Sequence, residues 1–145
     1  MVFVDAILPH PGKAWFETAP PDLSGMLRDR ARDGYVPPWP EWFPASVLAG
    51  LLPDAGVRAA FSGEAKAIPL KYLAEPAPAA RIAPSIPCAY LQLSGGYEAE
   101  ADAAAAAGWT VARLSLHHLA MLTDPVRVAG ALHSLIEALS VSSES

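Results

Sequence analysis

The amino-acid sequence predicts an α/β domain with a small parallel sheet of about three strands, flanking helices and a helical insertion. Three short apolar runs, at 2–4, 88–93 and 110–114, have the length and composition of buried strands. Helical patterns follow the second and third runs, at 98–107 and 125–139. Strand and helix alternating at this spacing are typical of a parallel sheet with right-handed crossovers.

Capping residues set the bounds of the two helices in the last third of the chain. Helix 98–107 carries acidic residues in its first turn, and Gly108 follows its end. Asp124 and Pro125 open the last helix. We expect the serine-rich tail, 140–145, to fray. Residues of helical period predict the buried face of the last helix: Val128, Leu132, Leu135, Ile136 and Leu139.

Prolines punctuate the segment between the first two strands. We expect a helix over 21–32, whereas four prolines within 37–44 exclude an α-helix there. Residues 45–74 predict two or three short helices, with Ser46 capping the first and Asp54 the second. Residues 75–87 contain four more prolines and predict an extended connector.

Composition excludes several classes of protein. The 145 residues suit one domain, and 52% of them are hydrophobic, which is enough to fill a core. A net charge of −5 with scattered Lys and Arg argues against nucleic-acid binding, and no apolar run is long enough for a membrane helix. The single cysteine, Cys88, allows no internal disulfide and fits a cytoplasmic protein. His10 and His133 are isolated, so we expect no metal and no cofactor.

Several segments together resemble the α/β-hydrolase family. Val2-Phe3-Val4-Asp5-Ala6 with the proline-bearing loop after it resembles the strand that follows the nucleophile elbow, and 13–75 resembles the helical cap. Residues 88–93 look like the strand that usually delivers the acid. The most specific match is His-Leu-Ala-Met at 118–121, just before Asp-Pro, which resembles the histidine loop. The resemblance covers nearly the whole chain and implies a single domain, 1–145, with a cap-like insertion at about 13–75.

The departure from the family concerns the nucleophile. The sequence has no Gly-x-Ser-x-Gly elbow and none of the strands or the oxyanion loop that family members place before it. The resemblance is therefore to the C-terminal half of the fold, a truncated α/β-hydrolase. A start codon chosen too far downstream would produce the same pattern.

His118 is the first candidate for chemistry. It lies four residues beyond the strand that ends at Leu114, at the sheet edge where α/β proteins form their sites, and a histidine suits acid–base work near neutral pH. The alternative is a histidine that only packs in its loop. Two acids could orient it. Asp5 ends the first strand, where some α/β-hydrolases carry an acid, and Glu98 follows the strand that usually supplies it. Asp5 could equally cap a loop, and Glu98 could serve only the helix dipole.

The remaining candidates are a serine, a cysteine and a group of aromatic residues. Ser94 is on the correct edge to bond His118, although a plain turn role is favoured. Cys88 opens its strand, roughly 16 Å from the level of His118, which is too far for proton transfer. Aromatic residues could line a substrate pocket under the cap or simply pack within it: Trp15, Tyr35, Trp39, Trp42 and Phe43.

Three functions compete at this level. The first is an enzyme without the serine nucleophile that uses His118 for cyclisation, isomerisation or elimination on a small apolar, polyketide-like compound of secondary metabolism. The second is half of a serine hydrolase, completed by a partner chain or by upstream sequence. The third is a non-catalytic remnant that binds a ligand or a partner. A homodimer through the exposed edge strand 2–4, or pairing with a complementary chain, would cover that strand.

Overall fold

The computed structural model describes residues 1–142, and the chain forms two compact units. Unit 1 consists of Met1–Leu8 and the described residues from Ile82 onward, and unit 2 consists of Pro9–Arg81. Unit 2 therefore extends a few residues beyond both ends of the predicted insertion, 13–75. The final helix continues to Ser142, and the last three residues of the predicted tail lie outside the described residues.

Unit 1 is built on a parallel sheet of three strands, which confirms the predicted fold class. The strands are β1 (Val2–Val4), β4 (Ala89–Gln92) and β5 (Thr110–Arg113), in the order β1-β4-β5. Phe3 pairs with Tyr90, and Tyr90 pairs with Val111. Every residue of the central strand β4 is buried, as its continuous apolar run predicts.

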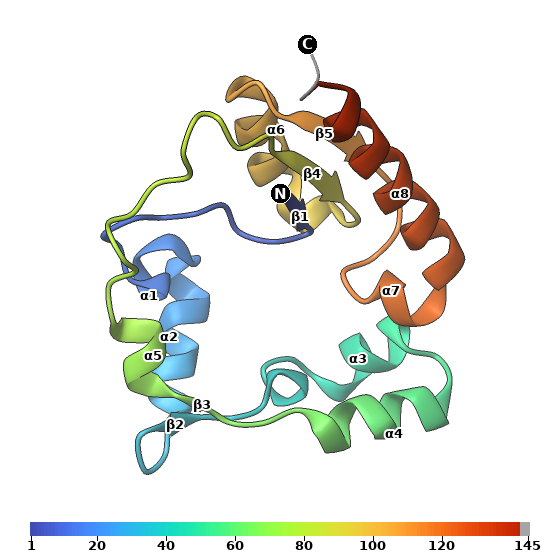
Figure 1. Ribbon diagram of the computed structural model, residues 1–145. Helices are drawn as coiled ribbons and strands as arrows, with labels where there is room; N and C mark the ends of the chain where they lie inside the picture. The colour runs from blue at the N-terminus through green and yellow to red at the C-terminus, as the bar shows by residue number, and fades with distance from the viewer. Residues whose placement is uncertain (143–145) are drawn as a thin grey trace. The chain divides into compact units, whose positions relative to one another are not determined.

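Helices cover both faces of this sheet (Figure 1). Because side chains of a strand alternate between faces, one set packs on α8 (Pro125–Ser142) and the other on α6 (Glu98–Ala106). Ala101 and Ala104 of α6 pack with Phe3, Tyr90 and Val111. The small side chains of α6 allow it to approach the sheet closely. The opposite core packs on α8 and includes Val2, Val4, Ala89, Leu91, Leu93 and Ala112.

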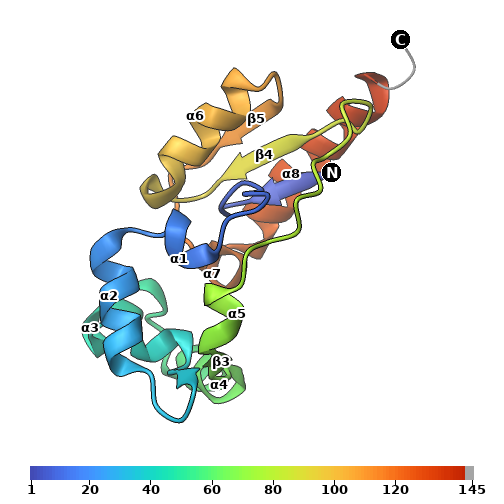
Figure 2. The ribbon, with the colours of Figure 1, turned by 90° about the vertical axis from the view of Figure 1, so that its left-hand side faces the viewer.

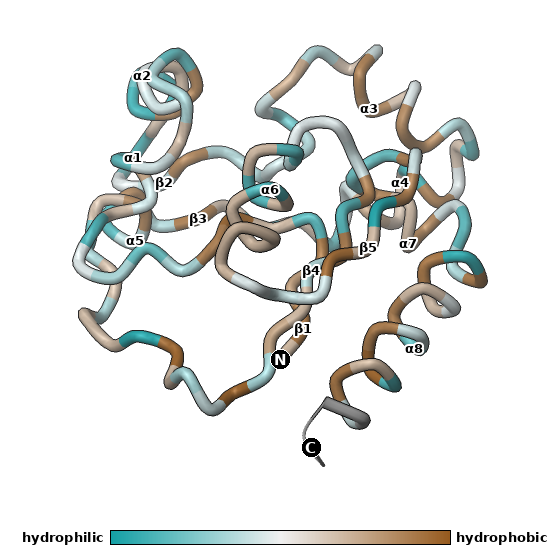
Figure 3. The backbone as a smooth tube through the Cα atoms, turned by 90° about the horizontal axis from the view of Figure 1, so that it is seen from above, coloured by the Kyte–Doolittle hydropathy of each residue, from teal (hydrophilic) through white to brown (hydrophobic). Residues whose placement is uncertain are grey.

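The buried face of α8 differs from the prediction at one position. Val128 and Leu135 are buried, and Leu132 and Leu139 pack against the same core. Ile136 was predicted to join them, but it is 53% exposed. The four packed positions are spaced by four, three and four residues, and Ile136 lies about 100° around the helix from Leu135. Apolar residues recur along the whole helix (Figure 3). The apolar face predicted from the sequence is therefore wider than the face of α8 that packs on the sheet.

Two short elements complete the carboxyl edge of the sheet in unit 1. A 3-10 turn, η2 (Gly95–Tyr97), leads from β4 into α6, and α7 (Ala120–Thr123) precedes α8. Both are short helical turns in the connections that leave the sheet at this edge. Gly108 ends α6 with a φ of 82°, a conformation that favours glycine, as predicted.

Unit 2 is mainly helical (Figure 2). The predicted helix over 21–32 is present but ends at Arg30. Residues 35–36 then pair with residues 68–69 as two short antiparallel strands, which the sequence does not predict. The proline-rich segment forms a single 3-10 turn instead of an α-helix, as expected. In chain order the elements are α1 (Trp15–Thr18), α2 (Pro21–Arg30), β2 (Tyr35–Val36), η1 (Trp39–Glu41), α3 (Ala45–Leu51), α4 (Ala55–Glu64), β3 (Ile68–Pro69) and α5 (Leu70–Ala74).

The predicted helix caps of unit 2 have different outcomes. Asp54 caps α4, since its carboxylate accepts the Val57 N–H at 2.8 Å. The expected Ser46 cap is wrong, because α3 begins at Ala45 with Pro44 as its N-cap residue, two residues earlier than expected, and Ser46 lies inside the helix. The fixed φ of Pro44 prepares the chain for the helix without a side-chain cap.

The two ends of unit 2 are joined by backbone hydrogen bonds, from Gly12 N–H to the Ala77 carbonyl and from Ala77 N–H to the Lys13 carbonyl.

Candidate acid–base site

The site lies at the carboxyl ends of the three parallel strands in unit 1. The Asp5 N–H donates to the Leu91 carbonyl at 2.8 Å, which places residue 5 beside the end of β4. After β5, the Leu116 N–H donates to the Leu93 carbonyl at 2.9 Å. The chain therefore passes back across the end of β4 toward β1, and this path brings His118 to Asp5.

Asp5 is the buried centre of the site. Its side chain is fully enclosed, and both carboxylate oxygens accept hydrogen bonds. Oδ1 accepts the N–H groups of Leu93, at 2.8 Å, and Ser94, at 2.9 Å. Oδ2 accepts the Ser94 hydroxyl at 2.7 Å and contacts His118 Nδ1 at 2.8 Å. The backbone of Asp5 has a φ of 42°, in the left-handed region that few side chains adopt.

These contacts favour the ionised form of Asp5. Burial raises the pKa of the Asp5 carboxyl, but the hydrogen bonds from His118, Ser94 and Leu93 outweigh burial and hold that pKa below its ordinary value of 3.8. Asp5 is therefore a carboxylate at neutral pH. Because a carboxylate has no proton to donate, His118 must carry its proton on Nδ1.

His118 is held in a defined orientation and remains partly accessible. With the proton on Nδ1, the lone pair of the neutral ring lies on Nε2, the atom that can take a proton from another molecule. About a third of the side chain is exposed (35%). The Tyr97 ring stacks on the imidazole, with centroids 5.1 Å apart and planes 19° apart. Asp5 and Tyr97 together restrict rotation of the ring.

Tyr90 supports the turn that follows Asp5. Its hydroxyl donates to the Ala6 carbonyl at 2.7 Å and accepts the Ala6 N–H at 3.0 Å, so one buried side chain satisfies both backbone groups. Burial, together with the negative charges of Asp5 and Glu100, raises the pKa of Tyr90 to about 12, against an opposing contribution from the Ala6 hydrogen bond.

We expect Tyr90→Phe to remove a loss of stability at alkaline pH. Because folding raises the pKa of Tyr90 from 10.0 to about 12, this tyrosine stabilises the fold fully below pH 10 and loses that contribution as the pH rises toward 12. The free energy of unfolding, measured in urea at pH 9, 10 and 11, should fall more steeply for the wild type than for the variant. Tyr72→Phe, at a side chain that is 70% exposed, is the control. Parallel curves for the wild type and Tyr90→Phe would contradict the assignment.

The structure brings together three of the residues singled out in the sequence: Asp5, Ser94 and His118. Asp5 is the acid in contact with His118, whereas Glu98 is exposed at the start of α6. Ser94 donates its hydroxyl proton to Asp5, so it serves the carboxylate. Cys88 is buried at the opposite end of β4, as the spacing predicts.

The predicted aromatic group belongs to unit 2. Trp15 and Trp42 pack edge to face at 6.0 Å, and the Trp42 indole N–H donates to the Pro37 carbonyl at 2.7 Å. Trp39 packs in the same way on Phe43, which is 37% exposed. Tyr35 is 51% exposed. Trp15, Trp39 and Trp42 thus help to form the core of unit 2, and the role of all five residues toward a substrate stays a prediction.

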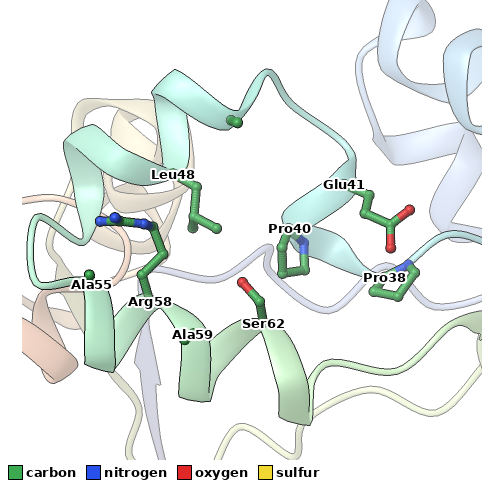
Figure 4. Close-up of a pocket in the computed structure, with 9 residues that line it drawn as sticks. Pro38, Pro40, Glu41, Leu48, Ala55, Arg58, Ala59 and Ser62 are labelled. Atoms are coloured by element: carbon green, nitrogen blue, oxygen red, sulfur yellow. The ribbon is translucent and has the colours of Figure 1, made fainter.

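Unit 2 has its own cavity, of about 370 Å³, between η1, α3 and α4 (Figure 4). Leu48 and Ala59 contribute apolar surface to it. Arg58 lies at its edge, but its guanidinium donates to the Pro53 carbonyl at 3.1 Å and also to the Leu52 carbonyl. Through Nη1, Arg58 therefore caps the end of α3.

Sequence reasoning missed the two tyrosines. Tyr97 follows the Ser-Gly-Gly turn, and no local pattern shows that its ring stacks on a histidine 21 residues later. Tyr90 carried a usable signal. It is a residue with a polar tip inside a buried strand, and such a hydroxyl usually has a hydrogen-bond partner.

The described residues contain neither a metal-ligand cluster nor a membrane-spanning helix. No three His, Cys, Asp or Glu side chains lie together as a metal site would require, over the part of the chain that the structure describes. Among residues 1–142, no helix has the length and apolar character needed to cross a bilayer.

A comparison of the fold with solved structures finds an α/β-hydrolase. The similar structure is described as an extracellular α/β-hydrolase from a Paenibacillus species that shares structural and functional homology with tobacco salicylic acid binding protein 2. The TM-score is 0.65 at 19% sequence identity, over 92% of this chain. The fold is α/β-hydrolase-like. The match covers 60% of the similar chain. No protein-family model and no curated protein matches the sequence.

Proposed function

We propose that Asp5 and His118 form an acid–base pair that moves protons on a small apolar molecule. The observation that carries the proposal is the 2.8 Å contact between His118 Nδ1 and a buried Asp5 that three further hydrogen bonds hold in place. In this arrangement Nε2 of His118 takes a proton from the substrate and returns it at another position. Asp5 stabilises the imidazolium that forms in between.

The reactions proposed are those that proton transfer by one acid–base group can drive. They are isomerisation, in which the proton returns to another atom of the substrate; cyclisation, in which the proton returns to the atom that becomes negatively charged when the new bond within the substrate forms; and elimination, in which it goes to the group that leaves. They suit this chain because the sequence has no nucleophile elbow, and Ser94 shares its proton with Asp5. The substrate proposed is a small apolar, polyketide-like compound. A small ring compound is in keeping with the description of the similar structure, which relates that protein to one named for binding salicylic acid.

Hydrogen–deuterium exchange tests the proposal without knowledge of the product. Purified protein is incubated in D₂O with a panel of small aryl ketones and β-diketones, and loss of the acidic C–H signal is followed by NMR. We expect exchange to be accelerated by the wild type and to fall roughly 10²- to 10⁴-fold in His118→Ala, the usual contribution of a general base. His133→Ala, at an exposed histidine, is the matched control. Equal exchange with the wild type and His118→Ala would overturn the proposal.

A serine hydrolase assembled from more than this segment is the second candidate. It is supported by the Asp–His pair, which supplies two of the three groups of a hydrolytic triad, and by a match to only 60% of a hydrolase chain. A partner chain or preceding sequence would add the serine, and β1 offers an edge for it, since β4 is its only neighbour in the described sheet. Aryl-ester hydrolysis and labelling by a fluorophosphonate probe, both appearing only after that addition, would favour this candidate over the first.

A further inference from the structure

We propose that Gln92 and Arg113 are positioning residues that hold Ser94 against Asp5 and, through Asp5, fix His118. The inference rests on the proposed acid–base role of His118. It assigns a task to two polar side chains outside the acid–base pair. Both lie on strands of the sheet and point to the face that α6 covers, as the alternation with Leu91 and Leu93 requires.

Gln92 links the sheet to the loop that carries Ser94. The residue is 8% exposed, and both ends of its amide are bonded. Oε1 accepts from the Arg113 guanidinium at 2.7 Å, and Nε2 donates to the Ser94 carbonyl at 3.0 Å. Because a guanidinium can only donate and a carbonyl can only accept, these two partners allow a single orientation of the amide.

Arg113 is itself fixed from two sides. Gln92 and Arg113 are paired residues of β4 and β5, so their side chains start as neighbours on one face. The second nitrogen of the guanidinium binds Asp102 of α6 at 2.6 Å. A continuous series of hydrogen bonds therefore runs from α6 through both strands to Ser94. We call Asp102, Arg113, Gln92 and Ser94 the clamp.

The loop needs the clamp because its own sequence is flexible. Two exposed glycines, Gly95 and Gly96, follow Ser94, and a Cβ added at Gly95 would meet nothing within 4 Å. Glycines and open space leave such a loop with high conformational entropy. Ser94 nevertheless supplies two of the four hydrogen bonds to Asp5. The clamp also borders a cavity of about 490 Å³, so on that side hydrogen bonds rather than packing hold the loop.

NMR of the His118 Nδ1–H proton tests the clamp without a substrate. In the wild type this proton should give a low-field signal, because it is bonded to a buried carboxylate. We expect Gln92→Leu and Arg113→Leu to move the signal upfield and to speed its exchange with water roughly three- to tenfold, the effect of losing one net hydrogen bond. Arg127→Leu removes an exposed arginine of unit 1 and should leave the signal unchanged.

Two further variants separate positioning from general loss of stability. Gln92→Glu keeps the size of the side chain and its bond to Arg113, but it turns a carboxylate oxygen toward the Ser94 carbonyl, so it too should shift the signal. Leu135→Ala weakens the opposite core and should leave the chemical shift as in the wild type. If the His118 Nδ1–H signal stays unchanged in Gln92→Glu and in folded Gln92→Leu and Arg113→Leu, the inference is overturned.

The result is distinguishable from failure of the proposed function. If the clamp variants shift the signal while His118→Ala retains full exchange activity, the positioning stands and the catalytic proposal fails. If His118→Ala loses activity and the clamp variants keep both signal and activity, the catalytic proposal stands and the positioning fails. When both hold, we expect Gln92→Leu to lower kcat roughly three- to tenfold with little change in KM.

Discussion

Asp5→Asn should destabilise unit 1 by about 2–4 kcal/mol at pH 7, because the change leaves buried donors without their acceptor. The asparagine has nearly the same shape, but it has one acceptor oxygen instead of two. Its NH₂ group would face either the N–H groups of Leu93 and Ser94 or the Ser94 hydroxyl and the His118 ring. The first orientation opposes donor to donor at a fully buried side chain. The second requires the Ser94 hydroxyl to turn and the His118 proton to move to Nε2, and neutral hydrogen bonds then replace the stronger ones to a carboxylate.

The pH dependence of this loss follows from the lowered pKa of Asp5. Since folding lowers that pKa below 3.8, the carboxylate stabilises the fold fully above about pH 4 and loses that contribution as the pH falls further. The free energies of unfolding of the wild type and Asp5→Asn, measured in urea between pH 2.5 and 7, should therefore converge toward the acid end. A gap that stays constant across this range would contradict the assignment.

Glu137→Gln is the matched control for Asp5→Asn. Glu137 also lies beside a basic side chain of unit 1, His133, at 3.3 Å, but 67% of the Glu137 side chain is exposed and it takes no part in the clamp. Water and salt screen such pairs, so the change should alter the free energy of unfolding by at most about 1 kcal/mol.

In the exchange assay Asp5→Asn should lose activity roughly 10²-fold or more, since an asparagine does not stabilise an imidazolium as a carboxylate does.

The sequence predicts the strands of unit 1, their parallel arrangement, and His118 with either Asp5 or Glu98 near the carboxyl edge of the sheet. This was possible because β4 is a continuous apolar run, and because Gly108, Asp124 and Pro125 mark helix ends by local chemistry. Parallel strands then place Asp5 and the segment after β5 on one edge by topology alone. The parallel sheet and the similarity to a solved α/β-hydrolase structure confirm the predicted α/β-hydrolase-like fold.

Contacts between distant side chains could not be predicted. The choice of Asp5 over Glu98 depends on the return of the chain across β4, which the Leu116–Leu93 bond records. The short pair β2–β3 contains two residues per strand, too few to produce a period. Its formation depends on the packing of Val36 and Ile68 in the core of unit 2.

Leu135 and Ile136 are neighbours on α8, but only Leu135 is buried against the sheet. Comparing their alanine variants measures how much this burial contributes to the free energy of unfolding. We expect Leu135→Ala to lower the free energy of unfolding of unit 1 by about 2–5 kcal/mol, because the side chain is 4% exposed and its removal leaves a cavity in the core that α8 shares with the sheet. Ile136→Ala removes a side chain of similar size, but 53% of the isoleucine is already exposed. Its effect should stay within about 1 kcal/mol.

Urea unfolding followed by the fluorescence of Trp109 measures both changes, since this tryptophan stacks on Phe3 in unit 1. Trp15, Trp39 and Trp42 of unit 2 are first replaced by phenylalanine, so that only unit 1 is observed, and all comparisons are made within that background. Dependence of the Ile136→Ala effect on protein concentration would point to a partner surface on α8, because an exposed isoleucine that is buried on association contributes only when the partner is bound. Equal losses for the two variants at every concentration would mean that α8 packs on the sheet through a different face.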